Sequence, residues 1–324
     1  MLKIGLIGCG FMGTMHANCY NILDDVQVVA VADVDRKKAH ALAKISGTEI
    51  YEDGFSLIEH AKVDAIDICL PTYLHAVHAE KAMRKVKNVF IEKPVALNAE
   101  ECDRLLKVQE ETGAGVQVGQ VIRFWDEYVY LKEVIDGKKY GKVENAFFSR
   151  LSPKPDWGWD NWLTDSERSG GAMLDLHIHD VDYMLYVFGK PDSCCGVHTD
   201  NSDEKNGYTM TLGDYGDFVV AVQGSWDFPS DYPFQASFRV KFENAVLEWY
   251  TNGLKLYADG NVKDITLDKM QLSAKGGGNI SELGGYYNEL KYFTDCLKNG
   301  EKPEKAGLAA AAESVRFIRN LMAK

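Results

Sequence analysis

The chain lacks the features that would place it in a membrane or on a nucleic acid. Among its 324 residues no apolar stretch approaches the roughly 18 that a membrane-spanning helix needs. It also has no excess of basic residues, because 36 Lys and Arg stand against 48 Asp and Glu and the net charge is −12. Nucleic acids and anionic membranes both bind basic surfaces, so we expect neither as a partner.

Paired cysteines are missing as well. The seven cysteines are scattered, and no two of them have C-x-x-C spacing. An odd, scattered set is more typical of a reducing cytoplasm than of a disulfide framework. The chain starts directly with a predicted strand, so we expect no signal peptide and a cytoplasmic protein. Internal repeats, low-complexity tracts and long linkers are absent too.

What the chain does contain, in its first 33 residues, is the set of parts from which a dinucleotide site is built. The apolar run Leu2 to Ile7 predicts a buried strand. Residues 8–13 (GCGFMG) complete G-x-G-x-x-G directly after it, and residues 14–23 can continue as a helix. A second strand is predicted from Val26 to Ala32, and Asp33 follows it.

Each of these parts has a physical role in holding a dinucleotide. Gly8 permits the tight turn, Gly10 lets the backbone approach the pyrophosphate, and Gly13 lets the helix pack on the strand. The pyrophosphate would sit on the helix N-terminus, where N–H groups favour an anion. Asp33 can accept hydrogen bonds from the adenosine ribose and would repel a 2′-phosphate, which favours NAD over NADP. The alternative is that Asp33 is a solvated acid at the end of a strand.

Strand and helix patterns alternate up to about residue 120. Predicted strands end at Pro71 and before Lys93, and Asn98 with Glu101 forms a capping box for a further helix. Such β-α units imply a parallel sheet, whose ligands bind at the carboxyl ends of the strands. We therefore expect Gly8, Asp33, Pro71 and Lys93 to share one crevice.

Beyond about residue 122 the pattern changes to short alternating runs separated by turn residues, followed by two helices. This pattern is typical of a largely antiparallel sheet. The predicted fold is α/β: an N-terminal Rossmann parallel sheet and a C-terminal α+β domain with an open, mostly antiparallel sheet. We expect an NAD-binding domain at residues 1–122 and a substrate-binding and oligomerisation domain at residues 123–324.

Within the second half, residues 169–189 predict one helix that ends at Gly189. Asp175, His179 and Asp182 are spaced four and three, so we expect them on one face of it. A carboxylate one turn from an imidazole can fix its tautomer, as a general base requires. The alternatives are a purely structural pair and a metal site that includes His177, although His-x-His on a helix points its two rings apart.

Lys93 has a structural and a functional interpretation. A lysine before a proline at a strand end can simply be exposed. However, Pro94 restricts Lys93 to extended backbone and so fixes its direction, in the crevice where the cofactor is expected.

Together these motifs resemble the glucose–fructose oxidoreductase, inositol dehydrogenase and rhizopine-catabolism (Gfo/Idh/MocA) family over nearly the whole chain. The matching residues are Gly8 to Gly13 with His16, Leu70-Pro71-Thr72 with His75, Glu92-Lys93-Pro94, Arg123-Phe124, and Gly170-Gly171 followed by Asp175, His179 and Asp182. The resemblance implies a polyol or sugar substrate and an open sheet that often forms the subunit interface, hence a homo-oligomer such as a dimer or tetramer. It also implies that the Lys-Pro bond is frequently cis.

By the same resemblance, Lys93, Asp175 and His179 match the catalytic set. The cofactor-binding positions implied are Gly8, Gly10, Phe11, Met12, Gly13, Asp33, Leu70, Pro71, Thr72, His75, Glu92 and Lys93. Substrate would meet Arg123, Asp175 and His179, together with Trp157 and Trp162 of an aromatic-rich loop, whose rings can pack on sugar C–H faces or simply pack in the fold. No metal is expected.

The expected function is therefore an NAD-dependent dehydrogenase of a secondary alcohol on a cyclitol or sugar. Two departures leave myo-inositol itself open: the motif with two arginines reads Ile122-Arg123, and the third glycine of the usual triplet is Ala172. Two other classes of function stay open. One is a sugar hydrolase or lyase that uses held NAD for transient oxidation, and the other is a non-catalytic sugar sensor.

Overall fold

The computed structural model describes residues 1–46, 48–199, 207–268 and 284–322. The chain divides into two compact units. The first comprises Met1–Phe124 and Met270–Val315, and the second comprises Trp125–Lys269 and Arg316–Lys324. The last helix, α11 (Leu308–Met322), begins in the first unit and ends in the second.

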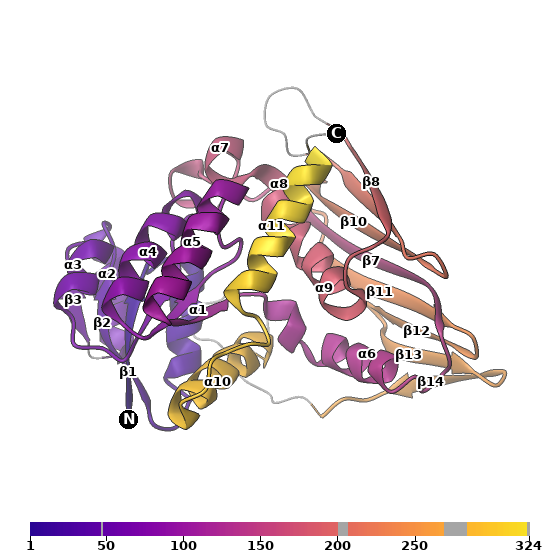
Figure 1. Cartoon of the computed structure of the whole chain (residues 1–324), viewed down its shortest axis with the longest axis horizontal. Coiled ribbons are helices and arrows are strands. Elements are labelled where there is room, and N and C mark those ends of the chain that lie inside the picture. The colour runs from indigo at the N-terminus through magenta and orange to yellow at the C-terminus, as the bar shows by residue number, and fades with distance from the viewer. Residues whose placement is uncertain (47, 200–206, 269–283, 323–324) are drawn as a thin grey trace. The chain divides into compact units, whose positions relative to one another are not determined.

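The first unit is built on a six-stranded parallel sheet with the order β3-β2-β1-β4-β5-β6 (Figure 1). The strands are β1 (Leu2–Ile7), β2 (Val26–Ala32), β3 (Glu49–Tyr51), β4 (Ala65–Ile68), β5 (Asn88–Ile91) and β6 (Gly115–Val118). The strand order reverses at β1, between β2 and β4. In a doubly wound sheet this reversal opens the crevice in which a ligand binds.

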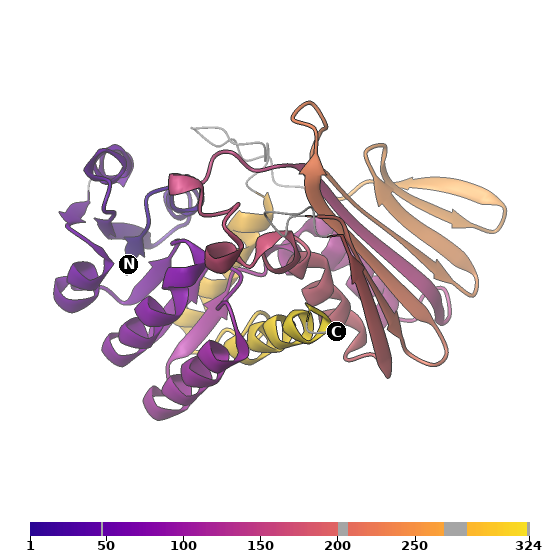
Figure 2. The ribbon, with the colours of Figure 1, turned by 90° about the horizontal axis from the view of Figure 1, so that it is seen from above.

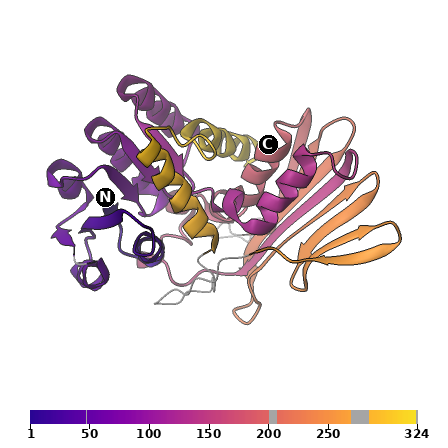
Figure 3. The same ribbon diagram turned by 90° about the horizontal axis from the view of Figure 1, so that it is seen from below.

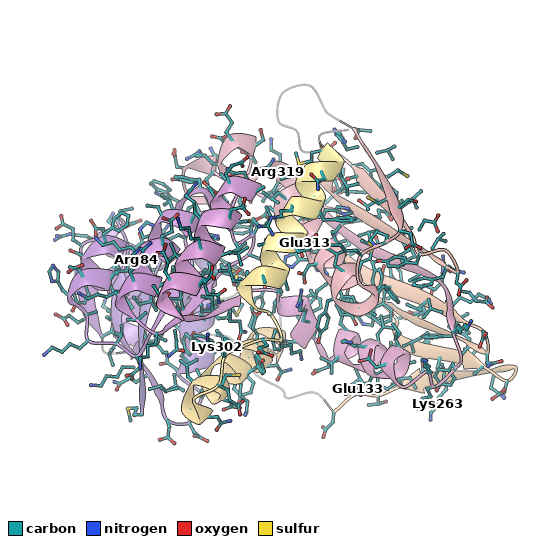
Figure 4. The ribbon with its side chains drawn as sticks, viewed as in Figure 1. Arg84, Glu133, Lys263, Lys302, Glu313 and Arg319 are labelled. Atoms are coloured by element: carbon teal, nitrogen blue, oxygen red, sulfur yellow. The ribbon has the colours of Figure 1, made fainter. Side chains whose placement is uncertain are left out.

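Helices and two short 3₁₀ turns connect and cover these strands. They are α1 (Phe11–Tyr20), α2 (Arg36–Ser46), α3 (Gly54–His60), η1 (Thr72–Leu74), α4 (His75–Lys85), α5 (Ala99–Thr112), η2 (Val121–Phe124) and α10 (Gly284–Asn299). The predicted cap is confirmed, because the Asn98 side chain accepts the Glu101 N–H at 2.9 Å. Charged side chains cover the outer helix surfaces; Arg84 on α4, labelled in Figure 4, pairs with Glu111 on α5.

The second unit is built on an eight-stranded sheet with the order β14-β13-β12-β11-β7-β10-β9-β8. Its strands are β7 (Val143–Pro153), β8 (Ser193–His198), β9 (Thr209–Asp214), β10 (Val219–Phe228), β11 (Gln235–Phe242), β12 (Ala245–Tyr250), β13 (Gly253–Ala258) and β14 (Asn261–Ile265). All neighbouring strands are antiparallel except β7 and β10, which run parallel. A parallel pair needs a long crossover connection, and here residues 154–218 form it.

Helices of the second unit lie against one face of this sheet, as Figures 2 and 3 show for α6 (Asp126–Asp136) and α9 (Ile178–Phe188). Aromatic rings fill the layer between them. Tyr128 on α6 packs edge-on against Tyr183 on α9, with ring centroids 4.7 Å apart, and against Phe238 on β11 at 5.3 Å. The crossover also contains η3 (Trp159–Asn161), α7 (Ser166–Ser169) and α8 (Gly171–Asp175).

The fold class agrees with the prediction: a Rossmann-like parallel sheet and a second, mostly antiparallel sheet. The compact units differ from the predicted domains because each consists of two separate segments of the chain. Part of the C-terminal segment belongs to the first unit. The assignment of NAD binding to residues 1–122 and of substrate binding to residues 123–324 stays a prediction. Within the described part of the chain, no helix has the length and apolar character to cross a bilayer.

One prediction was wrong. Residues 169–189 do not form a single helix, because α8 ends at Asp175 and α9 begins at Ile178. Between them the N–H groups of Leu176 and His177 both bond to the Ala172 carbonyl, each at 2.9 Å. The helix breaks because two successive side chains are buried in different places. Leu176 packs in an apolar cluster, whereas the His177 ring points toward β9 and forms a hydrogen bond with Thr211 at 2.8 Å. Asp175 therefore does not share one regular helix face with the two residues of α9.

Candidate functional site

The loop between β1 and α1 gives each of the three motif glycines a distinct setting. A Cβ on Gly8, whose φ is +94°, would lie 2.3 Å from the Cys69 carbonyl oxygen of the neighbouring strand end. A Cβ on Gly13 would lie 1.8 Å from the Gly8 carbonyl oxygen, so only glycine lets α1 pack this closely on the loop. Gly10, by contrast, has no atom within 4 Å of the position of a Cβ.

Asp33 is held at the end of β2 by the same loop. Its Oδ2 accepts the Cys9 N–H at 2.7 Å, and its Oδ1 accepts the Asp35 N–H at 2.7 Å. Each carboxylate oxygen has a second lone pair, so both can still accept a ribose hydroxyl. The next side chain, Val34, is 70% exposed and leaves this position open to solvent.

These residues fit a dinucleotide. The space over Gly10 lies at the N-terminus of α1, where Gly10 is the N-cap and has no side chain to occupy it. Phe11, Met12 and Gly13 form the first turn of that helix, where N–H groups and the helix dipole favour a phosphate. Asp33 provides the carboxylate for the ribose. The predicted cofactor positions after β1 and after β2 therefore lie side by side, joined by the bond from the Cys9 N–H to Asp33.

The predicted cofactor-binding segment after β4, Leu70 to Thr72, is held in place by hydrogen-bond contacts of His75. His75 is 1% exposed, and its Nδ1 and Nε2 lie 2.7 and 2.6 Å from the carbonyl oxygens of Pro94 and Leu70. It thus connects the Leu70-Pro71 segment to the loop after β5. Thr72 is completely buried. The geometry indicates that His75 contributes to a cofactor site indirectly, because its ring fixes the backbone of the loops after β4 and β5.

Lys93 stands at the carboxyl end of β5, as predicted, and the Lys93-Pro94 bond is cis, as the resemblance implies. The Glu92 carboxylate accepts the Lys93 N–H through Oε2 at 3.0 Å. Its other oxygen lies 3.1 Å from Nε2 of His16 on α1. The backbone at Lys93 is therefore connected to a buried histidine.

In the second unit, Asp175 and His179 differ from all their neighbours. Every residue from 171 to 184 is buried except these two, which are half-buried. Asp182, the third member of the predicted set, is completely buried, as are His177 and Asp180. Asp175 and His179 thus differ from Asp182 in burial: they are half-buried, whereas the Asp182 side chain is fully buried. Burial lowers the pKa of His177 to about 3, so this second histidine is a neutral interior ring.

The remaining predicted substrate residues have different surroundings. Trp162 packs against the apolar cluster of Leu163, Ala172, Leu176 and Trp226, whereas Trp157 is 58% exposed. Arg123 is 4% exposed and donates to the Lys305 carbonyl at 2.7 Å within the first unit. Trp162 therefore packs in the fold, and the roles of Trp157, Trp162 and Arg123 toward substrate stay predictions.

Sequence reasoning gave no role to a set of buried polar residues in the first unit. Asp67, Gln117 and Glu289 are each 0% exposed and come from β4, β6 and α10. Burial, with Glu92 nearby, raises the pKa of Glu289 well above its ordinary value. A polar residue inside an apolar run was the available signal: Asp67 interrupts the otherwise apolar AIDI of β4.

The sheet order, the glycine loop and Asp33 define a class of protein, the oxidoreductases with an NAD-binding Rossmann domain. Comparison with known sequences places the chain within that class. Residues 2–120 match the NAD-binding Rossmann fold of the Gfo/Idh/MocA oxidoreductase family, and residues 128–248 match the C-terminal domain of the same family. The chain belongs to this family and is an NAD-dependent oxidoreductase.

Relatives with assigned activities match along most of the chain. It is 27% identical to the myo-inositol 2-dehydrogenase of Thermotoga maritima, with 94% of this chain and 91% of that protein aligned. It is 26% identical to the scyllo-inositol 2-dehydrogenase (NAD⁺) of Bacillus subtilis, over 93% and 88% of the two chains. An Agrobacterium radiobacter oxidoreductase, solved with NAD⁺, L-tartaric acid and magnesium, shares the fold with a TM-score of 0.87 at 18% identity, over 100% and 96% of the chains.

Proposed function

We propose that the protein is an NAD-dependent dehydrogenase that oxidises a secondary alcohol on a cyclitol or sugar ring to a ketone. One observation carries the proposal: in the buried stretch from 171 to 184, only Asp175 and His179 reach the surface. An acid and an imidazole retained at the surface of an otherwise buried segment are the groups that a proton transfer from a bound hydroxyl needs. The names of the inositol 2-dehydrogenase relatives support a cyclitol as substrate.

In this mechanism the substrate loses a hydride and a proton. The residues of the β1–α1 loop and Asp33 would hold NAD, which would supply the acceptor for the hydride of the carbinol carbon. His179 takes the hydroxyl proton as the general base. Lys93 donates a hydrogen bond to the same oxygen and stabilises the negative charge that develops there. Asp175 orients His179 and accepts a hydrogen bond from a neighbouring hydroxyl.

The cofactor would be held by residues of the first unit. Gly10 and the first turn of α1 would receive the pyrophosphate, and Asp33 would accept the adenosine ribose hydroxyls. A 2′-phosphate would meet the Asp33 carboxylate, with Asp35 two residues away, and therefore we propose that NAD is preferred over NADP.

A substrate panel tests the proposed activity. Purified protein is incubated with cyclitols, aldoses and sugar acids and with NAD or NADP, NADH absorbance is followed, and the products are identified by mass spectrometry. We expect reduction of NAD with a ring ketone as product. The matched control is Lys302→Ala, which removes an exposed lysine; it should behave as the unmodified protein, whereas Lys93→Ala should lose activity.

The same panel separates the other two classes of function. Elimination or glycoside cleavage without net NADH would indicate a lyase or hydrolase that uses NAD transiently. Saturable sugar binding without any turnover, detected by calorimetry, would indicate a sensor. Either outcome would replace the dehydrogenase proposal.

We also propose a homo-oligomer, a dimer or tetramer, that forms through the helix-free face of the eight-stranded sheet. Apolar side chains that are 47–67% exposed lie on neighbouring strands: Val197 on β8, Leu212 on β9 and Val219 on β10. Pairing places Val197 opposite Met210 and Leu212 opposite Ala221, so the three project from the same face. An exposed apolar patch of this kind favours association. Sedimentation at micromolar concentration should show an oligomer, and a monomer alone would reject this proposal.

A further inference from the structure

A line of contacts runs from the Lys93 backbone into the interior of the first unit. The Lys93 N–H donates to Glu92 Oε2 at 3.0 Å, and Glu92 Oε1 lies 3.1 Å from His16 Nε2. On the other side of the ring, His16 Nδ1 lies 2.8 Å from Asp67 Oδ2. The side chains of His16 and Asp67 are 0% exposed and that of Glu92 is 7% exposed. One imidazole therefore stands between two buried carboxylates.

The surroundings of this ring favour its charged form. Asp67 also accepts hydrogen bonds from the Tyr20 hydroxyl at 2.9 Å and the Cys69 thiol at 3.4 Å. Burial alone would lower the pKa of His16, but its neighbours Cys69 and Asp67 outweigh burial, and the pKa is raised well above its ordinary value. The contact to Glu92 lacks the alignment of a hydrogen bond, so the attraction there is ionic. An imidazolium offers a positive charge to both carboxylates.

Gly119 lies directly against the Glu92 carboxylate. A Cβ at residue 119 would lie 2.9–3.0 Å from the three atoms of the Glu92 carboxylate, which is closer than real contacts allow. The carboxylate therefore lies against both His16 and Gly119, a residue without a side chain. Its position depends on both, and the Lys93 N–H bonds to that carboxylate.

Other titratable groups around the ring come from every element packed against it. They are Cys19 and Tyr20 on α1, Asp67 and Cys69 at β4, Glu92 after β5, and Tyr286 and Glu289 on α10. Both Glu289 carboxylate oxygens are buried and have no hydrogen-bond partner among the described residues, and its pKa is raised, so this side chain is neutral. Burial likewise raises the pKa of Tyr20 and of Cys69.

We propose that His16 is a positioning residue of the dehydrogenase: as a buried imidazolium it holds the Glu92 carboxylate against the Lys93 backbone N–H and so fixes the direction of the Lys93 side chain. The proposal rests on the proposed function, in which Lys93 contacts the substrate oxygen. His16, Asp67 and Cys69 also have the donor types of a metal site. Their donor atoms lie 2.8–3.4 Å apart, at direct hydrogen-bonding distances, and we interpret them as a hydrogen-bonded group.

The first part of the test needs neither substrate nor turnover. In protein labelled with ¹⁵N-histidine, His16 should show the resonances of a doubly protonated ring from pH 6 to pH 8.5, where a solvent-exposed histidine becomes neutral. The signal is assigned by its loss in His16→Gln. A neutral His16 ring at pH 7 would overturn the proposal, whatever the enzyme activity.

The second part measures positioning. His16→Gln removes the charge, and Gly119→Ala displaces the Glu92 carboxylate without touching His16. Both variants should lower kcat at least about tenfold, since small displacements of catalytic groups are costly, while the NAD dissociation constant, measured by fluorescence, changes less than about threefold. Gly284→Ala is the matched control, because no atom of the described residues lies within 4 Å of a Cβ there; its kcat should be unchanged.

The outcomes are distinguishable. If Gly119→Ala folds, as circular dichroism would show, and keeps kcat within about twofold of the unmodified protein, the positioning role is wrong even if His16 is charged. If the unmodified protein oxidises no polyol or sugar, the proposed function fails, yet the ¹⁵N measurement still decides whether His16 is an imidazolium.

Discussion

Arg150 and Asp180 form an ion pair inside the second unit. Nε of Arg150 lies 2.7 Å from Oδ2 of Asp180, Nη2 lies 3.2 Å from Oδ1, and the two side chains are 3% and 0% exposed. The Tyr128 hydroxyl adds a further bond to Asp180 at 3.2 Å. Because Arg150 belongs to β7 and Asp180 directly follows His179, the pair fixes α9 to the middle of the sheet.

Removal of one partner should therefore destabilise the protein strongly. Asp180→Ala leaves the Arg150 guanidinium buried without its counter-charge, a change that typically costs about 3–5 kcal/mol. Lys132→Ala is the control, since it breaks an exposed pair with Asp136 on the same face of the fold and should cost less than about 1 kcal/mol. Urea unfolding measures both. Equal midpoints for the two variants would contradict the buried role.

His179→Ala should lower kcat by about 100-fold or more, because it removes the proposed general base. NAD affinity should not change, since the cofactor residues lie in the first unit. Stopped-flow or steady-state rates and a fluorescence titration check the two halves. As a control, His198→Ala changes an exposed histidine of β8 and should leave kcat unaltered. Near-normal turnover of His179→Ala would remove this residue from the mechanism.

Cofactor preference should depend on Asp33. Like charges close together in a cleft cost on the order of a few kcal/mol, which corresponds to about two decades in affinity. In Asp33→Ser with Val34→Arg, the repulsion is gone and a phosphate partner is present, so the ratio of kcat/KM for NADP over NAD should rise about 100-fold. Steady-state constants decide it. If the unmodified protein uses both cofactors equally, Asp33 is not the selector.

The three glycines of the loop should respond differently to alanine. Gly10→Ala meets no protein atom within 4 Å, so stability should change by less than about 1 kcal/mol, but its methyl group enters the space expected for the pyrophosphate and NAD affinity should fall at least about tenfold. Gly13→Ala would clash with the Gly8 carbonyl at 1.8 Å and should reduce stability itself. Thermal unfolding with and without NAD separates the two effects. Unchanged NAD binding by Gly10→Ala would place the pyrophosphate elsewhere.

His177 should make stability fall in acid. Its pKa is lowered to about 3 in the folded protein, whereas an unfolded histidine titrates near 6.5. Between these values the unfolded chain binds a proton that the folded chain does not. The contribution of His177 is therefore complete above about pH 6.5 and falls by about 1.4 kcal/mol per pH unit below it. The difference in unfolding free energy between the unmodified protein and His177→Gln, measured from pH 7 to pH 4.5, should show this slope. A difference independent of pH would show that the ring titrates normally.

The sequence predicted the parts of the site that depend on short segments. Gly8 and Gly10 follow β1, and Asp33 follows the neighbouring strand β2. Their spacing in the sequence was therefore enough to indicate their arrangement. The break between α8 and α9 was not predictable in this way, because it depends on His177 reaching Thr211 and lying against Gly224, residues of two distant strands. The local periodicity of the sequence does not predict such long-range contacts.

The contacts of His16 were hidden for a related reason. Its neighbours come from residues 67, 92 and 289, and α10 reaches this place only because part of the C-terminal segment packs into the first unit. Pattern reasoning treats each β-α unit in turn, so it recognised Glu92 and His16 as separate motif positions. It had no means to bring a residue near 289 beside them.

The discontinuity of the first unit also sets an order of events during protein synthesis. The ribosome completes all six strands of the parallel sheet by residue 118, but α10, which packs on α1 and η2, emerges only after the whole eight-stranded sheet. Until then Gln117 lacks the Glu289 carbonyl that accepts its side-chain N–H at 3.2 Å. The contacts of α10 with the dinucleotide-binding unit can therefore form only after nearly the whole chain has been synthesised, so this unit stays incompletely covered until then.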